Sequence, residues 1–88
     1  MKTNREIKLS KHASKRAFER GINLEEIKEV IISGNLSCEK HNRYSSVKVF
    51  KYKKEWEGTI YSKKQVKVIF IEENDKIMVI TAISRFFN

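Results

Sequence analysis

The chain has 88 residues, 40% of them hydrophobic, which allows one small domain with a single core and excludes a second. Nineteen Lys and Arg against eleven Asp and Glu give a formal net charge of +8, which favours a polyanionic partner such as RNA. No apolar run approaches the roughly 18 residues of a membrane-spanning helix, so no membrane partner is expected.

The N-terminal residues, MKTNREIKLSK, contain neither a continuous apolar stretch nor a small-residue cleavage site. They are not typical of a signal peptide, and we expect a cytoplasmic protein. The single cysteine, Cys38, excludes an internal disulfide, and we expect its thiol to be buried. Cys38 and His41 have the spacing C-x-x-H, but zinc requires about four ligands, so we expect no metal and no cofactor.

The first predicted helix begins at Ser10 and ends at Arg20. Ser10 is a good N-cap, and Gly21 can adopt the left-handed conformation that closes a helix. Leu9, Ala13 and Ala17 recur every four residues, with Phe18 beside them, and predict a narrow apolar face. Such a face requires close packing against another element.

The second predicted helix, residues 24–33, carries the clearest signals in the sequence. Asn23 and Glu26 match a capping box, and Gly34 follows the last turn. Apolar residues at helical spacing predict its core-facing side, namely Leu24, Ile27, Val30 and Ile31.

Beyond Gly34 the composition changes to the β-branched and aromatic residues that favour strands. The predicted strands are 36–40, 45–53, 57–62, 65–72 and 77–85. A hairpin turn over 72–76 makes the last two strands antiparallel. Residues 1–88 thus predict a single α+β domain, in which two N-terminal helices pack on one face of an antiparallel sheet of four to five strands. The other face of the sheet is partly open.

A basic surface is predicted on this open face. From Lys48 to Lys54, lysines alternate with Val, Phe and Tyr, as in a strand with one solvated face. Arg43 and Tyr44 combine a cation with an aromatic ring, as phosphate contact and base stacking require. The same residue types also protect or pack a strand edge. The predicted RNA contacts are Arg43, Tyr44, Lys51, Lys53 and Lys67, with Lys54, Lys63 and Lys64 as further candidates.

A polar cluster is predicted on the first helix, where His12, Arg16 and Glu19 follow helical spacing with Arg20 beside them. RNA cleavage without metal needs a group that takes the proton of the 2′-hydroxyl, a group that protonates the leaving oxygen, and a cation over the phosphorane. His12 and Arg16 could supply two of these. A solvent-facing helix surface without catalytic role would carry the same residues.

A family resemblance is carried by three features: the pattern His12-Ala13-x-x-Arg16-x-x-x-Arg20-Gly21-Ile22, a capped helix ending at Gly34, and a closing strand Val79-Ile80-Thr81. The chain resembles a family of small, toxin-like bacterial domains of unknown function, related by fold to the RelE and BrnT ribonuclease toxins. The resemblance extends from about Leu9 to Thr81 and is loosest over residues 35–64.

The resemblance implies a RelE-like or barnase-like fold with a curved sheet, and the activity of a metal-independent endoribonuclease toxin. The implied partners are RNA and a cognate acidic antitoxin that covers the basic face. RelE-like toxins also have a basic or aromatic catalytic residue near the C-terminus, for which Arg85 is a candidate because it shares a strand face with Thr81. The predicted catalytic residues are His12, Arg16, Arg20, Thr81 and Arg85.

Two alternative functions fit the same residues. A non-catalytic RNA-binding or regulatory module would keep the basic sheet face and bind RNA without cleaving it. A ParE-like toxin of this fold would inhibit a protein target such as a topoisomerase. The sequence contains no Gly-rich phosphate loop, Ser-His-Asp order or paired carboxylates, so other enzyme classes are not expected.

Overall fold

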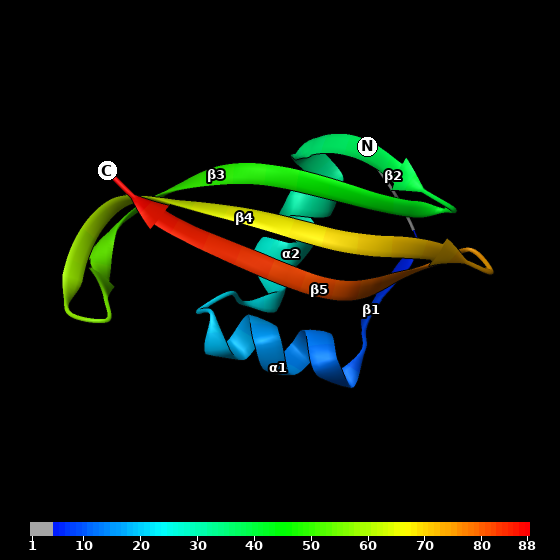
Figure 1. The fold of residues 1–88 in the computed structure, drawn as a ribbon, viewed down its shortest axis with the longest axis horizontal. Helices are drawn as coiled ribbons and strands as arrows, with labels where there is room; N and C mark the ends of the chain where they lie inside the picture. The colour runs from blue at the N-terminus through cyan, green and yellow to red at the C-terminus, as the bar shows by residue number, and fades with distance from the viewer. Residues whose placement is uncertain (1–4) are drawn as a thin grey trace.

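The computed structural model describes residues 5–88, in which two helices cover one face of a five-stranded sheet (Figure 1). Residues 1–4, the start of the segment that lacks signal-peptide features, lie outside the described residues. Within residues 5–88, no helix is long and apolar enough to cross a membrane. The elements in chain order are β1 (Glu6–Leu9), α1 (Lys11–Glu19), α2 (Leu24–Ser33), β2 (Asn35–Lys40), β3 (Arg43–Trp56), β4 (Thr59–Glu73) and β5 (Lys76–Phe87).

The strands form one open sheet in the order β1-β5-β4-β3-β2. Strands β2 to β5 are antiparallel, as predicted, whereas β1 runs parallel to β5. The prediction that the helices precede the whole sheet is therefore wrong for β1. Its four residues offer only two apolar positions, Ile7 and Leu9, and this is too short for alternation to identify a strand.

Both helices begin where their caps predict. The Ser10 hydroxyl accepts a hydrogen bond from the backbone N–H of Ala13 at 3.0 Å. Asn23 and Glu26 form both bonds of the capping box, at 2.8 and 3.0 Å. Gly21 follows α1 in the left-handed conformation, with a φ of 68°. The local capping signals thus mark where both helices begin.

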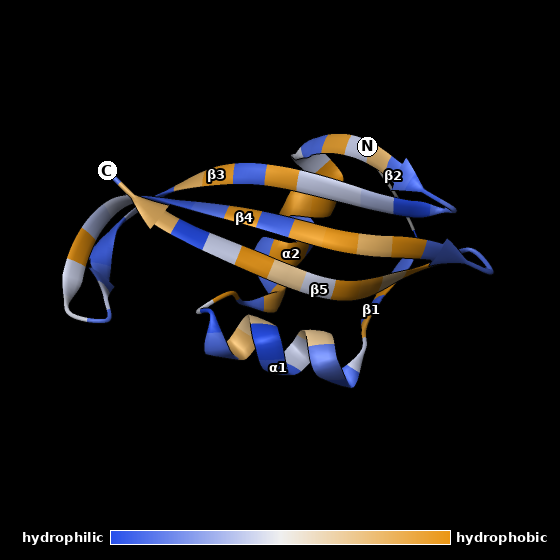
Figure 2. Ribbon diagram, viewed as in Figure 1, coloured by the Kyte–Doolittle hydropathy of each residue, from blue (hydrophilic) through white to orange (hydrophobic). Residues whose placement is uncertain are grey.

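The core lies between the helices and the sheet. Ala13 and Ala17 are buried, and their small side chains let α1 approach β5 closely. Apolar residues run along the middle of β4 and β5 (Figure 2). Each large aliphatic or aromatic side chain that is fully buried contributes about 1.5–3 kcal/mol. The buried residues opposite the two alanines include Ile27, Val30, Ile31, Val66, Val68, Phe70, Ile77 and Val79.

The predicted strands 57–62 and 65–72 are one continuous strand, β4. The pair Lys63-Lys64 resembles a solvated connection in the sequence, but Lys64 is buried and belongs to the sheet. The β3–β4 turn lies instead at Glu57 and Gly58, whose φ angles are 50° and 87°. As a result the β3–β4 hairpin is long, and its tip bends away from the body of the sheet (Figure 1).

An aromatic cluster connects the bent end of this hairpin to Phe86 on the helix side of the sheet. The Phe86 ring lies 4.9 Å from the Trp56 ring and 5.0 Å from the Tyr52 ring, measured between centroids.

Lys64 donates a hydrogen bond to the carboxylate of Glu26 at 2.7 Å and another to the backbone carbonyl of Gly21. Lys64 is thus part of an internal ion pair, and the prediction that it contacts phosphate is wrong.

The edge strand β2 is exposed along its whole length. The Cys38 thiol is therefore exposed, and the expectation of a buried thiol is wrong. The reason is that, among residues 5–88, β2 is an edge strand that pairs with β3 on one side.

Candidate nucleic-acid interface

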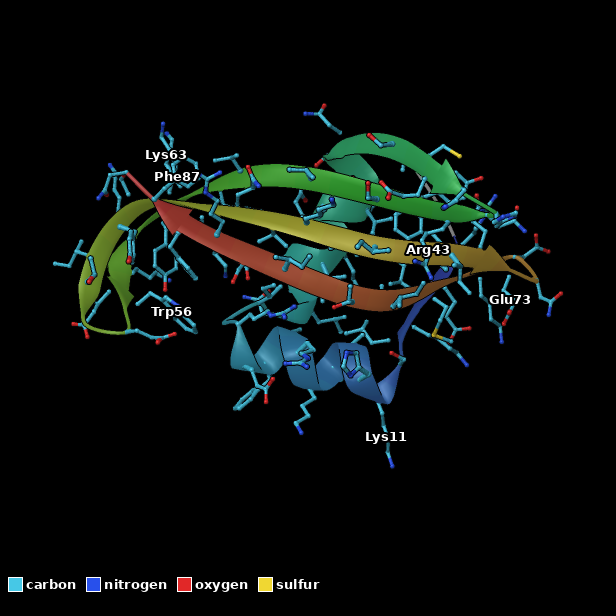
Figure 3. All side chains as sticks on the ribbon, in the orientation of Figure 1. Lys11, Arg43, Trp56, Lys63, Glu73 and Phe87 are labelled. Atoms are coloured by element: carbon cyan, nitrogen blue, oxygen red, sulfur yellow. The ribbon has the colours of Figure 1, made fainter. Side chains whose placement is uncertain are left out.

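The sheet face opposite the helices carries a cluster of cations at the end near the C-terminus. The register pairs Lys63 with Lys51 on β3 and with Phe87 on β5. Directly paired residues point to the same face, and the alternate positions of β4, such as Val66 and Val68, face the helices. Lys63 and Phe87 lie side by side in Figure 3. We call the following residues the open-face cluster: Lys51, Lys63, Lys67, Arg85 and Phe87.

A bulge in β5 determines which side chains reach this face. Ile69 pairs with Thr81, whereas Phe70 pairs with Val79, so Ile80 is an extra residue in β5. Val79 faces the core, and without the extra residue Thr81 would face it too. Thr81 and Arg85 share one face of β5, as predicted. The bulge turns this face toward the open side of the sheet. The sequence gives no signal for the bulge itself.

Two cations of the cluster lie over the Phe87 ring. The Lys63 ammonium nitrogen is 5.9 Å from the centroid of the Phe87 ring, and the Arg85 guanidinium carbon is 5.6 Å from it. These distances are typical of cation–π contacts. A ring flanked by cations combines the two contacts made by single-stranded nucleic acid, base stacking and phosphate pairing.

The charges of the cluster are not balanced by ion pairs in the described part of the chain. Within residues 5–88, Lys51, Lys63, Lys67 and Arg85 have no ion-pair partner. Lys51 and Lys63 are direct cross-strand neighbours, and such like-charged pairs destabilise a sheet by a few tenths to about 1 kcal/mol. An anion bound between them would remove this repulsion.

The other predicted RNA contacts lie in different places. Arg43 shares the open face but is near its opposite end (Figure 3). Lys53 is exposed in the irregular segment where the β3 register shifts, with a φ of 52°. Tyr44 lies on the helix side, where its ring stacks on Phe70 at 5.7 Å, so it is not available on the open face.

Sequence reasoning left Phe87 out of the predicted RNA contacts and gave Lys63 no special weight. Division of β4 into two strands placed Lys63 in a connection rather than beside Phe87. A regular β4–β5 hairpin counted from its Asn74-Asp75 turn would place Lys63 one residue out of register with Phe87. The bulge shifts the register by that residue, so the two are directly paired.

The predicted catalytic residues of α1 lie on its exposed side. Ala13 and Ala17 face the core, which turns His12 and Arg16 toward solvent. An Arg16 guanidinium nitrogen is 3.6 Å from a carboxylate oxygen of Glu19. In the described part of the chain, His12 makes no hydrogen bond and no ion pair.

Arg20 attaches α1 to the edge of β5. Its guanidinium donates a hydrogen bond to the carbonyl of Ala82 at 2.7 Å, and the Ser84 hydroxyl donates to the carbonyl of Arg20 at 2.9 Å. Arginine has five N–H donors, so the side chain keeps donors for a phosphate. Thr81, the neighbour of Ala82, faces the open side. The α1 residues and the open-face residues therefore flank the same strand.

No group of three or more His, Cys, Asp or Glu side chains that could hold a metal ion occurs among residues 5–88. A polar hollow of about 340 Å³ near the β2–β3 turn is lined by Glu39, Lys40, His41, Arg43 and Ile71. It lies at the Arg43 end of the sheet, away from the open-face cluster.

Fold and surface together define a small basic α+β domain with a cationic, partly aromatic sheet face. Residues 9–84 match a family described as a domain of unknown function (DUF4258). The match covers most of the chain, and the protein belongs to this family. No curated protein and no solved structure matches the chain. The prediction of an uncharacterised domain family is confirmed, and the family description assigns no activity.

Proposed function

We propose that this protein is a metal-independent endoribonuclease toxin of a toxin–antitoxin system that binds RNA on the open-face cluster. The observation that supports this most strongly is the row Lys51, Lys63 and Phe87 with Arg85 beside it. Cations without an ion-pair partner among residues 5–88 stand beside an aromatic ring on the sheet face opposite the two described helices.

The cluster suits single-stranded RNA. Neighbouring strands lie about 4.8 Å apart, so the row across β3, β4 and β5 extends about 10 Å. One base can stack on Phe87 while Lys63 and Arg85 contact the phosphates on either side. Phosphate contacts of this kind depend little on sequence and weaken as salt rises.

We assign RNA cleavage to the region where the end of α1 contacts β5. An imidazole can accept or donate a proton near neutral pH, and His12 takes this role. Arg16 and Arg20 stabilise the charge on the phosphorane, while Thr81 and Arg85 hold the RNA from the open face. With His12 as base, the 2′-hydroxyl gives its proton to the imidazole, the 2′-oxygen attacks the phosphorus, and the bond to the 5′-oxygen breaks. Solvent water protonates the leaving 5′-oxygen, so the products are a 2′,3′-cyclic phosphate and a 5′-hydroxyl and no metal-bound water is required. An acidic antitoxin would neutralise the cationic surface and block RNA entry.

Cleavage of total RNA in EDTA tests this function. Wild-type protein should cleave the RNA, and His12→Ala should retain RNA binding but lose most cleavage. Lys15→Ala serves as the control, because it removes an exposed cation from the same helix on a different side. Undiminished cleavage by His12→Ala would remove His12 from the mechanism, and loss of wild-type cleavage in EDTA would contradict a metal-independent reaction.

A non-catalytic RNA-binding module is the second candidate. It is favoured by the hydrogen bond of Arg20 to Ala82 and the ion pair of Arg16 with Glu19, which engage both helix arginines internally. This function predicts RNA binding by the wild type without cleavage, and unchanged affinity in His12→Ala. The same cleavage and binding assays distinguish the two functions.

A further inference from the structure

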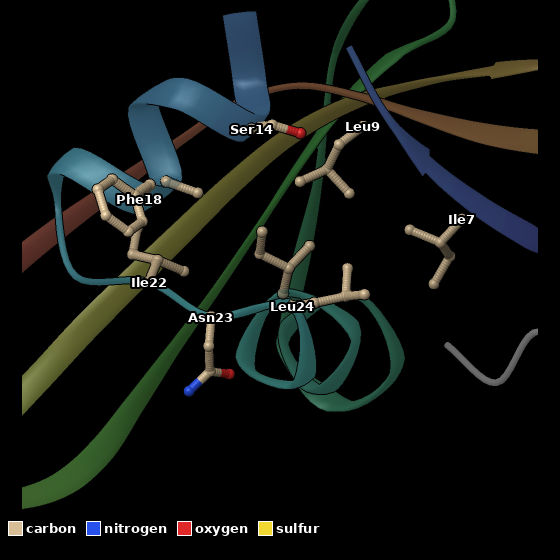
Figure 4. Close-up of a pocket in the computed structure, with 9 residues that line it drawn as sticks. Ile7, Leu9, Ser14, Phe18, Ile22, Asn23 and Leu24 are labelled. Atoms are coloured by element: carbon tan, nitrogen blue, oxygen red, sulfur yellow. The ribbon is translucent and has the colours of Figure 1, made fainter. Parts of the chain in front are cut away.

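A second surface lies on the opposite side of α1 from Arg16. A groove of about 510 Å³ opens between α1, α2 and β1 (Figure 4). Phe18 of α1 and Leu24 of α2 lie on its two sides, with Ile7 and Leu9 along the β1 wall. The lining is largely apolar, and it opens to solvent instead of being closed by another part of residues 5–88.

Two apolar side chains beside the groove are exposed to solvent instead of being buried in the core. Phe18 is 85% exposed and Leu24 is 47% exposed. A contiguous exposed apolar surface of this kind marks an interaction site more often than a single exposed residue does. The Phe18 ring contributes little to the core, so its position is explained better by binding than by folding.

Three lysines share the helix sides that carry the groove residues Phe18 and Leu24. On α1, Lys11 and Lys15 precede Phe18 by seven and three residues and share its side of the helix. On α2, Lys28 follows Leu24 by one turn. None of these lysines has an ion-pair partner in the part of the chain that the structure describes. Glu25 offsets one of these charges, and the border of the groove remains cationic.

We propose that the groove between α1 and α2 binds an acidic amphipathic helix of a partner protein. Apolar residues of that helix, spaced by three and four positions, would contact Phe18 and Leu24. Its carboxylates would pair with Lys11, Lys15 and Lys28. A second copy of this chain fits poorly, because a symmetric contact would bring two lysine borders and two net charges of +8 together.

The proposed partner leaves the RNA surface free. Ser14 and Phe18 line the groove, whereas His12 and Arg16 lie on another side of α1. Binding in the groove is therefore independent of the proposed RNA cleavage, and either proposal can fail without the other.

A peptide library displayed on phage tests the proposal directly. Random peptides of about 16 residues are selected on the full-length protein and counter-selected on Phe18→Ala, which has the same charge. Enriched peptides should be acidic, with apolar residues at helical spacing. The counter-selection removes peptides that bind only because the protein is basic. The proposal would be overturned if the enriched peptides were neutral or basic, or if no enriched peptide were specific for the wild type.

Affinities of the enriched peptides, measured by fluorescence anisotropy, locate the contact. Phe18→Ala and Leu24→Ala should each weaken binding about tenfold or more, as expected for buried anchors. Lys11→Glu should also weaken it, whereas Lys63→Ala on the open face should not. Phe18→Ala should melt at the wild-type temperature, because the ring is exposed. A wild-type dimer in sedimentation analysis that Phe18→Ala dissociates would assign the groove to a second copy and overturn the proposal.

Discussion

The ammonium group of Lys64, which is buried, lies 2.7 Å from the partly buried carboxylate of Glu26, and this ion pair joins β4 to α2. Its sequence neighbour Lys63 points to the other face of the sheet and has no acidic partner within residues 5–88. Two adjacent lysines thus have opposite roles, one in the fold and one on the proposed RNA surface.

Removal of the buried lysine should destabilise the protein strongly. Lys64→Ala leaves Glu26 without its cation and the Gly21 carbonyl without its donor, and such losses amount to about 1–3 kcal/mol. Urea unfolding monitored by Trp56 fluorescence gives the free energy of unfolding. Lys63→Ala is the matched control and should be neutral or slightly stabilising, because Lys51 loses a like-charged neighbour. Equal effects of both substitutions would contradict this assignment of faces.

The Glu29 carboxylate should titrate below its ordinary range. A hydrogen bond from Lys48 and another from Ser33 hold the pKa of Glu29 below 4.5. Because the folded pKa is lowered, the contribution of Glu29 to stability is present above the unfolded pKa and is lost as pH falls through the folded pKa. A carbon-detected NMR titration of Glu29 measures this, and Lys48→Met should raise the pKa toward 4.5. A Glu29 pKa unchanged by that substitution would contradict the Lys48 contact.

RNA affinity should depend on the cations of the open-face cluster. For single-stranded RNA, each phosphate contact contributes about 0.7 to the slope of log affinity against log salt. Lys63→Ala with Arg85→Ala should therefore weaken binding and reduce the slope by about 1.4, if each removes one contact. Anisotropy of a labelled oligoribonucleotide between 50 and 200 mM NaCl measures both. Lys11→Ala with Lys15→Ala removes the same charge from α1, and an equal reduction there would indicate a non-specific effect of net charge.

Arg20→Ala should lower the free energy of unfolding more than Arg16→Ala does. Arg20→Ala removes the hydrogen bond to Ala82 at the edge of β5, and loss of such a bond costs about 1–3 kcal/mol. Arg16→Ala removes only an exposed pair with Glu19, which is worth about 0–1 kcal/mol. Thermal unfolding compares the two variants. An Arg20→Ala protein as stable as the wild type would show that this bond does not hold α1 in place.

Local chemistry made the helices predictable. Asn23 and Glu26 form the capping box that the sequence indicates, and α2 occupies the predicted residues 24–33. Alternation along β4 puts Val66, Val68 and Phe70 on one common face, and the structure shows that this face is buried. These features depend on residues close together in the chain, where propensity and periodicity carry the information.

Features that depend on distant pairing were not predictable. The parallel contact of β1 with β5 joins segments about 70 residues apart, and nothing in Glu6–Leu9 specifies it. The bulge at Ile80 determines the face of Thr81 and Arg85, yet no glycine or other local signal marks it. The open-face cluster exists only through the register of three strands. The candidate site on α1 was indicated by helical spacing, but its position beside β5 needed the structure.

Chemical-shift mapping with RNA tests the central proposal most directly. A 2′-O-methyl oligoribonucleotide cannot be cleaved by its own 2′-oxygen, so the bound state can be observed with wild-type protein. We predict that the largest amide shifts occur at the open-face cluster, with smaller shifts in α1 near Arg16 and Arg20. Shifts confined to the groove between α1 and α2 or to the Arg43 end of the sheet would contradict RNA binding on this face. The absence of any shift would contradict it too.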